Sequence, residues 1–359
     1  MLSPKTIILE GPEQAKDRHI PLLYGLPDHL AILCLARVPR QFHRVLSCVS
    51  RRWRALLCSD EWRSCRRRLN LEETWVYAMC MSKYRVNYCY VLDPNLPRRY
   101  WKCLQPIPSR CVCREGMSME TLGKKLFLLG GCSWREDATD EVYCYDSSIG
   151  KWEEAARMPT ARCYFLSATI DGKIYITGGV GLSWDACKSW DIYDGNSNNW
   201  SSCQDPSLIP DIVKFFVFES KLYTIHKTWI ETQYARVYDP LTERWEDANE
   251  VMTSCGRGPT VVVNGILYML DETCGTRLMR WQKETDEWVL LGRLAQLLTK
   301  PPCQTVAVGS SIFIIGQNLS TVVVDLDVAG KVEGMLVGSS FAPCLHNDLA
   351  VIDCKVTSI

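Results

Sequence analysis

The side chains of this sequence that could ligate a metal or act as strong nucleophiles are nineteen cysteines and five histidines. The cysteines are scattered, none are spaced as C-x-x-C, and the pair Cys111 and Cys113 has no matching pair elsewhere. A structural zinc site needs four such ligands at short, regular spacings, so the pattern does not indicate zinc. Reduced and mostly buried thiols are the simpler interpretation, and they are typical of the cytosol or nucleus.

The histidines do not form a catalytic or metal-binding set either. They are dispersed along the chain, at His19, His29, His43, His226 and His346. The sequence also lacks G-x-S-x-G, a P-loop and a dinucleotide-binding glycine motif, which are the local signatures of several enzyme classes. We therefore predict a protein that is not an enzyme and has neither metal nor cofactor. A metabolic enzyme is kept as an alternative, and stoichiometric bound metal would favour it.

The framework that positions any site over residues 74–355 is an internal repeat. Tryptophans recur at intervals of 43 to 51 residues, at Trp101, Trp152, Trp200, Trp245 and Trp288. An aromatic residue stands seven positions before each of the last four, at Tyr145, Tyr193, Tyr238 and Trp281. Apolar stretches such as LFLLGG (126–131) and IYITGG (174–179) come before these aromatics. Four short strands in each unit of this length are typical of the blades of a β-propeller.

Six units can be counted, although the weaker first and last units leave seven blades open. A propeller must close to remove its open strand edges, so we expect HNDLAVIDC (346–354) to pair with the first unit. The paired glycines of units two and three need no chemistry, because glycine lets backbones approach closely where blades converge. The repeated tryptophans are expected to pack between blades.

Residues 21–70 have a different pattern, that of short helices. Pro27 suits a first helical turn, and Ser50 and Ser59 are suitable N-caps. Phe42, Val45, Leu46 and Val49 share one helical face. A segment of this size cannot bury all its apolar side chains alone, so this surface meets either a partner or the rest of the chain.

Positive charge is concentrated in the same segment. Ten arginines and no lysine lie between Arg37 and Arg68, opposed only by Asp60 and Glu61, for a local charge of roughly +8. A solvated face and a surface for an acidic protein partner are compatible interpretations. Nucleic-acid binding is not indicated, because no groove-entering element with interleaved aromatics is present.

A motif runs through these helices from Leu26 to Arg54. It consists of Leu26-Pro27-Asp28, Leu30, Ala36-Arg37-Val38-Pro39, Val45, Val49 and Ser50-Arg51-Arg52-Trp53-Arg54. In order and spacing it closely resembles an F-box, which implies binding to a Skp-type adaptor of an SCF ubiquitin ligase. The residues that would contact the adaptor or form the core are Leu26, Pro27, Leu30, Val38, Pro39, Val45, Val49 and Trp53. The motif alone does not separate these two roles.

The Gly-Gly, aromatic and tryptophan positions resemble the kelch repeat, so the whole chain resembles a plant-type F-box/kelch-repeat protein. The resemblance implies a small all-α F-box module followed by an all-β kelch propeller. It also implies a substrate-recognition subunit that binds the adaptor, through it a cullin, and a client protein for ubiquitin-dependent degradation. The expected location is the cytoplasm or nucleus. A kelch scaffold that acts outside ubiquitination is the alternative.

Client binding is expected on long loops that carry tryptophans. Trp134, Trp184 and Trp229 lie in equivalent connections of units two, three and four, and Arg135 and Arg162 could join them. Tryptophan and arginine are common anchors of protein recognition sites. The alternative is that these tryptophans fold back onto neighbouring blades.

Two further expectations concern the N-terminal region and membranes. Residues 1–20 give no functional signal and are expected to be disordered. Their opening, MLSPKTIILEGPEQ, has only a short apolar stretch and does not have the pattern of a secretory signal. No apolar run of the sequence approaches the ~20 residues needed to cross a membrane, so no membrane association is expected.

Overall fold

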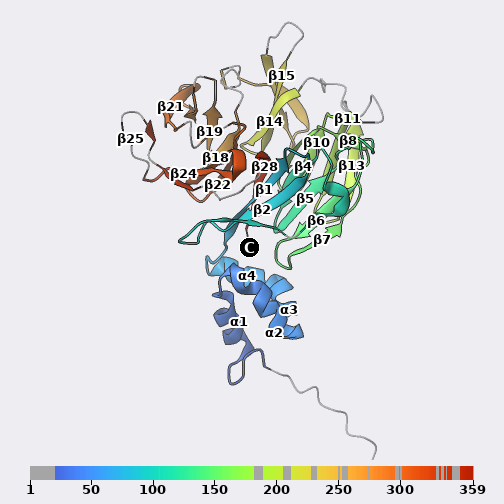
Figure 1. The fold of residues 1–359 in the computed structure, drawn as a ribbon, viewed down its shortest axis with the longest axis vertical. Helices are drawn as coiled ribbons and strands as arrows, with labels where there is room; N and C mark the ends of the chain where they lie inside the picture. Colours follow the sequence, from blue (N-terminus) through green and yellow to red (C-terminus); the bar gives the residue numbers. More distant parts are fainter. Residues whose placement is uncertain are drawn as a thin grey trace, which may run out of the picture. The chain divides into compact units, whose positions relative to one another are not determined.

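The computed structural model describes residues 21–104, 106–181, 189–204, 212–227, 233–249, 251–252, 258–273, 275–295, 299, 301–328, 331–332, 335–336, 338–341 and 348–358. The chain divides into two compact units, one ending at Leu71 and the other beginning at Glu72 (Figure 1). The first contains helices, and the second is built of strands. The expected disorder of residues 1–20 concerns residues outside the described part.

The described part of the helical unit, residues 21–71, contains four short α-helices and one 3₁₀ turn. They are α1 (Asp28–Ala36), η1 (Arg40–Phe42), α2 (His43–Val49), α3 (Arg51–Cys58) and α4 (Asp60–Arg68). The predicted N-caps are confirmed. Ser50 Oγ accepts a hydrogen bond from the Trp53 amide at 3.1 Å, and Ser59 Oγ accepts one from the Trp62 amide at 3.2 Å. Each cap satisfies an amide that would otherwise have no partner at the helix start.

The core of this unit is an apolar cluster drawn from the segment before α1 and from α1, α3 and α4. Its buried members are Leu22, Ala31, Ile32, Leu35, Ala36, Leu56, Leu57, Trp62 and Cys65. Arg66 is buried beside them and donates to the carbonyls of Ala36 (2.7 Å) and Val38 (3.1 Å). These carbonyls lie at and just beyond the end of α1, where no helical amide can reach them. One arginine of the basic segment therefore has a structural role.

The second unit is a six-bladed propeller, as predicted, with four antiparallel strands in each blade and two further short strands on the sheet of the fifth blade. Blade one consists of β28 (Leu349–Ser358), β1 (Thr74–Ser82), β2 (Asn87–Leu92) and β3 (Trp101–Cys103). Blade two consists of β4 (Ser118–Leu122), β5 (Lys125–Leu129), β6 (Val142–Asp146) and β7 (Lys151–Glu154). Blade three consists of β9 (Leu166–Ile170), β10 (Lys173–Thr177), β12 (Ser189–Asp194) and β13 (Asn199–Gln204).

Blades four to six have the same arrangement. Blade four consists of β14 (Ile212–Phe218), β15 (Lys221–Lys227), β16 (Gln233–Asp239) and β17 (Arg244–Asp247). Blade five consists of β18 (Thr260–Val263), β19 (Ile266–Asp271), β20 (Arg277–Gln282) and β21 (Glu287–Arg293). Blade six consists of β22 (Gln304–Val308), β23 (Ser311–Ile315), β24 (Thr321–Asp325) and β27 (Ser339–Phe341). Short pieces complete the described elements: η2 (Ser109–Cys111), β8 (Arg162–Cys163), β11 (Val180–Gly181), η4 (Gln317–Leu319), β25 (Lys331–Val332) and β26 (Met335–Leu336).

The ring closes as the sequence predicted, with a C-terminal strand in the first blade. β28 pairs antiparallel with β1, from Thr74 opposite Ser358 to Ser82 opposite Leu349. The innermost strands of the six blades, namely β28, β4, β9, β14, β18 and β22, contribute to the lining of a central cavity of about 750 Å³. Closure covers the edge of β1, which would otherwise be the open inner edge of blade one.

The seven-residue spacing of aromatics has a direct geometric cause. Tyr145 and Trp152 are directly opposite each other across the hairpin of β6 and β7, with ring centroids 5.1 Å apart. The same pairing occurs at Tyr193–Trp200, Tyr238–Trp245 and Trp281–Trp288. Trp200 Nε1 in blade three donates to Ala156 O, which follows the last strand of blade two, at 2.8 Å. The tryptophans thus pack within their hairpin and, at Trp200, bind the preceding blade.

The paired glycines lie where two backbones nearly touch. A Cβ atom on Gly130 would be 2.5 Å from Arg162 O, and one on Gly179 would be 2.6 Å from Cys163 O. Both glycines also have positive φ, which L-residues rarely adopt. The expected close approach is confirmed at both positions.

Candidate interaction surfaces

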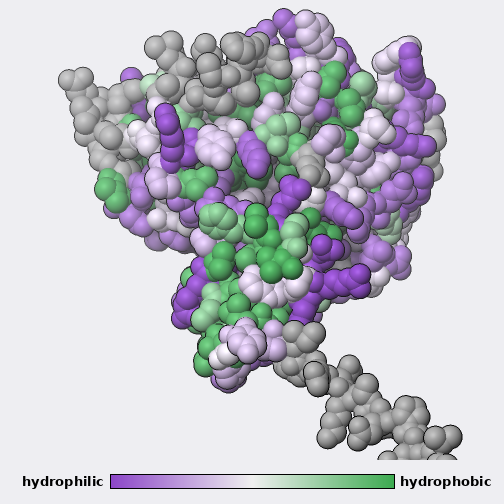
Figure 2. Space-filling model, turned by 60° about the horizontal axis from the view of Figure 1, so that its bottom comes forward, coloured by the Kyte–Doolittle hydropathy of each residue, from purple (hydrophilic) through white to green (hydrophobic). Residues whose placement is uncertain are grey.

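The helical unit exposes an apolar stripe on α2 and the turn before it. Phe42, Val45 and Val49 have 48%, 64% and 59% of their surface exposed. They follow the i, i+3, i+7 spacing that places side chains on one helical face. The opposite side of the helix is used inward, because His43 is buried against Trp62 and Leu46 packs on the apolar core. Figure 2 shows hydrophobic residues gathered on the surface of this unit. We call Phe42, Val45 and Val49 the α2 face.

The structure separates the eight motif residues into two groups. Leu26 and Trp53 pack against the core, and Trp53 Nε1 donates to Leu22 O at 2.9 Å. Val38 is half-buried, and its carbonyl accepts from Arg66. The remaining five are exposed: Pro27, Leu30, Pro39, Val45 and Val49. This exposed group presents the larger share of its surface to a partner, whereas Leu26, Val38 and Trp53 are half-buried.

The arginines of the helical unit differ in their exposure. Arg40 and Arg66 are buried, and Arg52 forms an ion pair with Asp28. The exposed members are Arg37, Arg44, Arg51, Arg54, Arg67 and Arg68. Two of these bind carbonyls in the last turn of a helix: Arg37 donates to Leu33 O at 2.7 Å, and Arg54 donates to Ser47 O at 3.1 Å. The surface remains strongly basic even after the structural arginines are set aside.

On the propeller, the connection between β5 and β6 folds back into a small hairpin. Ser133 and Glu136 exchange backbone hydrogen bonds of 2.8 and 3.2 Å, which leaves Trp134 and Arg135 at the tip. Trp134 is 83% exposed, and the Arg135 guanidinium lies 4.1 Å from the indole centroid. The structure thus brings together two of the predicted client-binding residues and presents them to solvent.

Arg162 does not belong to this exposed group. It has no exposed surface, and its guanidinium donates to Asp191 Oδ2 (2.7 Å), Ser189 Oγ (2.9 Å) and Gly178 O (3.0 Å). The sequence-based assignment of Arg162 to a client surface is therefore corrected, because a guanidinium that is completely buried inside blade three cannot reach a partner. Trp184 and Trp229 lie outside the described residues.

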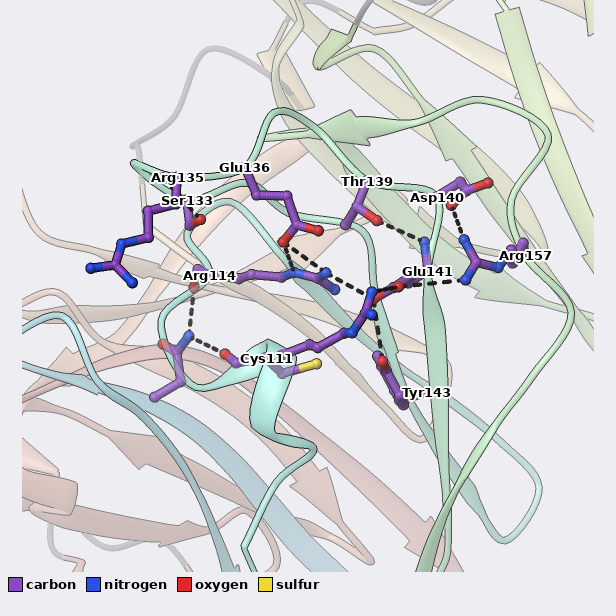
Figure 3. A network of polar contacts seen from close by, with 12 residues as sticks. Cys111, Arg114, Ser133, Arg135, Glu136, Thr139, Asp140, Glu141, Tyr143 and Arg157 are labelled. Carbon is purple, nitrogen blue, oxygen red and sulfur yellow. Dashed lines mark hydrogen bonds and ion pairs between the residues drawn. The ribbon is translucent and has the colours of Figure 1, made fainter.

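A buried ionic network anchors the exposed hairpin (Figure 3). Arg114, only 1% exposed, lies between two carboxylates, with Nη2 at 3.0 Å from Glu136 Oε2 and 2.8 Å from Glu141 Oε2. Arg110 Nη1 and Tyr143 Oη also bind Glu141, at 2.5 and 3.2 Å. Burial alone would raise the pKa of Glu141, but the hydrogen bond and charge of Arg114 outweigh it and lower this pKa. Glu141 therefore stays ionised at neutral pH and the anchor persists.

Sequence reasoning missed a second exposed tip beside the first. The turn between β1 and β2 is closed by hydrogen bonds from the Ser82 amide to Val86 O and from the Arg85 amide to Ser82 O, both 2.9 Å. It presents Tyr84, which is 77% exposed, next to Arg85. The missed signal was the aromatic–arginine pair itself, which Tyr84–Arg85 shares with Trp134–Arg135.

Glu115 joins the two tips. Its carboxylate pairs with Arg85 and accepts from Tyr164 Oη at 3.1 Å, while its backbone exchanges hydrogen bonds of 2.7 and 2.9 Å with Cys132. The hydrogen bond from Arg85 is the main cause that lowers the pKa of Glu115. Cys132 immediately precedes the hairpin that bears Trp134, so both tips and Tyr164 lie at one end of blades one to three.

The described part of the chain lacks two other features. It contains no cluster of three or more His, Cys, Asp or Glu side chains that could hold a metal ion. None of its helices combines the length and apolar character needed to cross a membrane.

Comparisons with known proteins match both units. The model of the F-box domain matches residues 23–64, and that described as FKB95, Kelch-repeats domain, matches residues 76–305. F-box/kelch-repeat protein SKIP4 of Arabidopsis thaliana is 42% identical over 358 residues, which cover 98% of this chain and 99% of that protein. F-box/kelch-repeat protein SKIP30 of the same plant is 26% identical, covering 94% of this chain and 97% of its own.

A solved structure of YjhT has the same propeller fold. It superposes with a TM-score of 0.50, covering 74% of this chain and 91% of its own, at 14% sequence identity. The matches to both domain models and the near full-length match to SKIP4 agree in order and extent with the two structural units. The chain is a member of the F-box/kelch-repeat family.

Proposed function

We propose that this protein is the substrate-recognition subunit of an SCF-type ubiquitin ligase. Its helical unit binds a Skp-type adaptor and, through it, a cullin, in the cytoplasm or nucleus. Its propeller holds a client protein for ubiquitin-dependent degradation, and the chain performs no chemistry itself. The observation that carries this proposal is the exposed α2 face in a unit that matches the F-box domain.

Burying the α2 face against a partner would be favourable in free energy. Fully burying a large apolar side chain is worth about 1.5–3 kcal/mol, and these three side chains forgo about half of that gain while they face water. The folded unit gains no stability from this exposure. A partner with an apolar groove would bury these side chains and so recover the forgone free energy. The exposed arginines of the same unit would speed association with an acidic partner surface.

The propeller contributes by holding the client close to the enzyme that transfers ubiquitin. A client bound on the same chain as the adaptor-binding unit is kept near the ubiquitin-charged enzyme of the complex. Tethering raises the local concentration of client lysines without adding a catalytic group. A subunit of this kind needs a binding surface and a rigid support, which are the two features that the propeller offers.

Co-purification with a Skp-type adaptor tests the proposal. Wild-type protein is expected to retain the adaptor, and the double variant Val45→Glu/Val49→Glu is expected to lose it, because two charges would be buried at the interface. Leu241→Glu is the matched control, since Leu241 is equally apolar and 84% exposed but belongs to the propeller. A folded wild type that does not bind the adaptor would contradict the proposal and favour a kelch scaffold acting outside ubiquitination.

A further inference from the structure

We propose that the two tips of the propeller form a preformed docking surface for a client segment in which an acidic residue adjoins an apolar one. The surface consists of Tyr84, Arg85, Glu115, Trp134, Arg135 and Tyr164, and we call it the tip surface. The inference deepens the proposed function, on which it rests, by naming where the client binds and what chemistry it presents.

The two tips repeat one design. Each is a tight, hydrogen-bonded turn that places an aromatic residue and then an arginine at its most exposed point, Tyr84–Arg85 in blade one and Trp134–Arg135 in blade two. Aromatic and arginine side chains dominate the energetics of protein recognition. Four aromatic side chains are exposed in the described part of the propeller, and the tip surface contains all except Tyr100. This concentration distinguishes the tip surface from the rest of the described propeller.

The backbone of both tips and the side chains of Arg85 and Tyr164 are held in place before any partner arrives. Glu115 binds Arg85 and Tyr164 from two neighbouring segments, and Arg114 binds Glu136 directly beneath the Trp134 hairpin (Figure 3). Arg114 itself is fully buried and also tied to Glu141. Side chains that are already fixed lose little conformational entropy on binding, so a short segment can bind this surface with useful affinity.

The charges that remain available on the tip surface are positive. Glu115 is engaged by Arg85 and Tyr164, and Glu136 by Arg114. Arg135, in contrast, forms no ion pair with any described residue and only stacks on Trp134. Arg85 is 70% exposed and binds Glu115 through one nitrogen. Guanidinium groups prefer carboxylates, which they bind in a two-pronged geometry, and the adjacent indole and phenol rings prefer apolar groups.

Acidic residues at the edge restrict the class of partner. Asp137, two positions after Arg135, is exposed to solvent. Near the other tip Asp348 is also exposed, and its Oδ2 lies 3.8 Å from Lys83 Nζ. These carboxylates would repel an extended polyanion, so a nucleic acid is disfavoured. A peptide segment with one or two well-placed carboxylates avoids this repulsion and satisfies the arginines.

The test is selection of random peptides displayed on phage, with the full-length chain as bait. Selected peptides are expected to share Asp or Glu beside a large apolar residue. A selected peptide, measured by fluorescence anisotropy, is expected to bind Trp134→Ala and Arg135→Glu at least about tenfold more weakly. Leu241→Ala and Arg244→Glu are matched controls on exposed residues of blade four, and they are expected to bind like the wild type.

Three outcomes would overturn the proposal: no enriched motif, a motif without acidic residues, or equal binding by Trp134→Ala and Arg135→Glu. Thermal unfolding of each variant shows that lost binding is not lost folding. The proposed ligase role is tested separately, because tip variants should still retain the adaptor and Val45→Glu/Val49→Glu should still bind the peptide. Adaptor binding without peptide enrichment would overturn only the docking surface.

Discussion

Lys355 Nζ lies 3.0 Å from Glu120 Oε1, and this ion pair joins the C-terminal strand β28 to blade two inside the central cavity. Glu120 is only 2% exposed and also accepts from Ser167 Oγ (2.7 Å) and Thr169 Oγ1 (2.9 Å) in blade three. One buried carboxylate thus connects three adjacent blades. Removing Lys355 would leave the buried Glu120 carboxylate with only neutral hydrogen-bond donors, which costs free energy in a protein interior.

Lys355→Met should therefore destabilise the propeller by about 3 kcal/mol, in the range measured for breaking buried ion pairs. The measurement is urea unfolding followed by circular dichroism. Lys283→Met is the control, since Lys283 pairs with Glu219 at 2.6 Å where both side chains face water, and such pairs contribute at most about 1 kcal/mol. Equal losses in the two variants would mean that the Glu120 network does not stabilise ring closure.

Asp353, next to this pair, gives the stability a distinct pH dependence. Burial is the main cause that raises its pKa to about 6, against 3.8 when unperturbed. The folded state thus binds this proton more tightly than the unfolded state, so the contribution of Asp353 to stability increases as pH falls from above 6 towards 3.8. Above pH 6 the ionised group is unfavourable by up to about 3 kcal/mol, because one pKa unit corresponds to about 1.4 kcal/mol.

Asp353→Asn should therefore raise the melting temperature at pH 7.5, and the difference from wild type should shrink as pH falls towards 4. Thermal unfolding of both proteins across this pH range provides the measurement. A constant difference would show that the variant acts through packing rather than through the proton.

The two arginines that the sequence grouped together should behave in opposite ways. Arg162→Ala removes three hydrogen bonds and leaves Asp191 charged with no exposed surface, so we expect a loss of about 3–5 kcal/mol. Arg135→Ala removes only an exposed cation over Trp134, which is worth about 0.5–1 kcal/mol. Chemical denaturation of the two variants separates these cases, and similar losses would contradict the structural assignment.

Glycine substitutions in blade three can isolate the cost of close backbone approach. Gly172 and Gly179 have nearly the same φ, +79° and +83°, so alanine meets the same backbone strain at both. Open space surrounds Gly172, whereas a Cβ on Gly179 would be 2.6 Å from Cys163 O. Gly172→Ala should cost about 1–2 kcal/mol, and Gly179→Ala clearly more. Equal melting temperatures would show that the backbone around Gly179 yields freely.

The fold was predictable because its signal is local. Tyr145 and Trp152 are seven positions apart and directly opposite in one hairpin, so sequence spacing and spatial pairing coincide. The buried charges were not predictable in the same way. Arg162 and Asp191 are 29 positions apart, and Arg114 and Glu141 are 27 apart. Nothing in the spacing of such residues indicates whether the polypeptide between them brings them together.

The helical unit shows a second limit. Phe42, Val45 and Val49 have the periodicity of a core-facing helix, yet they face solvent, while His43 and Arg66 lie inside. Periodicity identifies an apolar face but not what covers it. Burial in the folded chain was needed to separate Leu26 and Trp53, which support the unit, from Val45 and Val49, which are available to a partner.

The pairing of β28 with β1 also determines the order in which the protein can be completed during its synthesis. Thr74 and Ser358, which face each other across this pair, are 284 positions apart, so five blades leave the ribosome before blade one receives its innermost strand. Until then β1 has an open edge, which can pair with a foreign strand. The helical unit has its own core and is complete once Leu71 has been made. A nascent chain can therefore present the α2 face well before its propeller is able to hold a client.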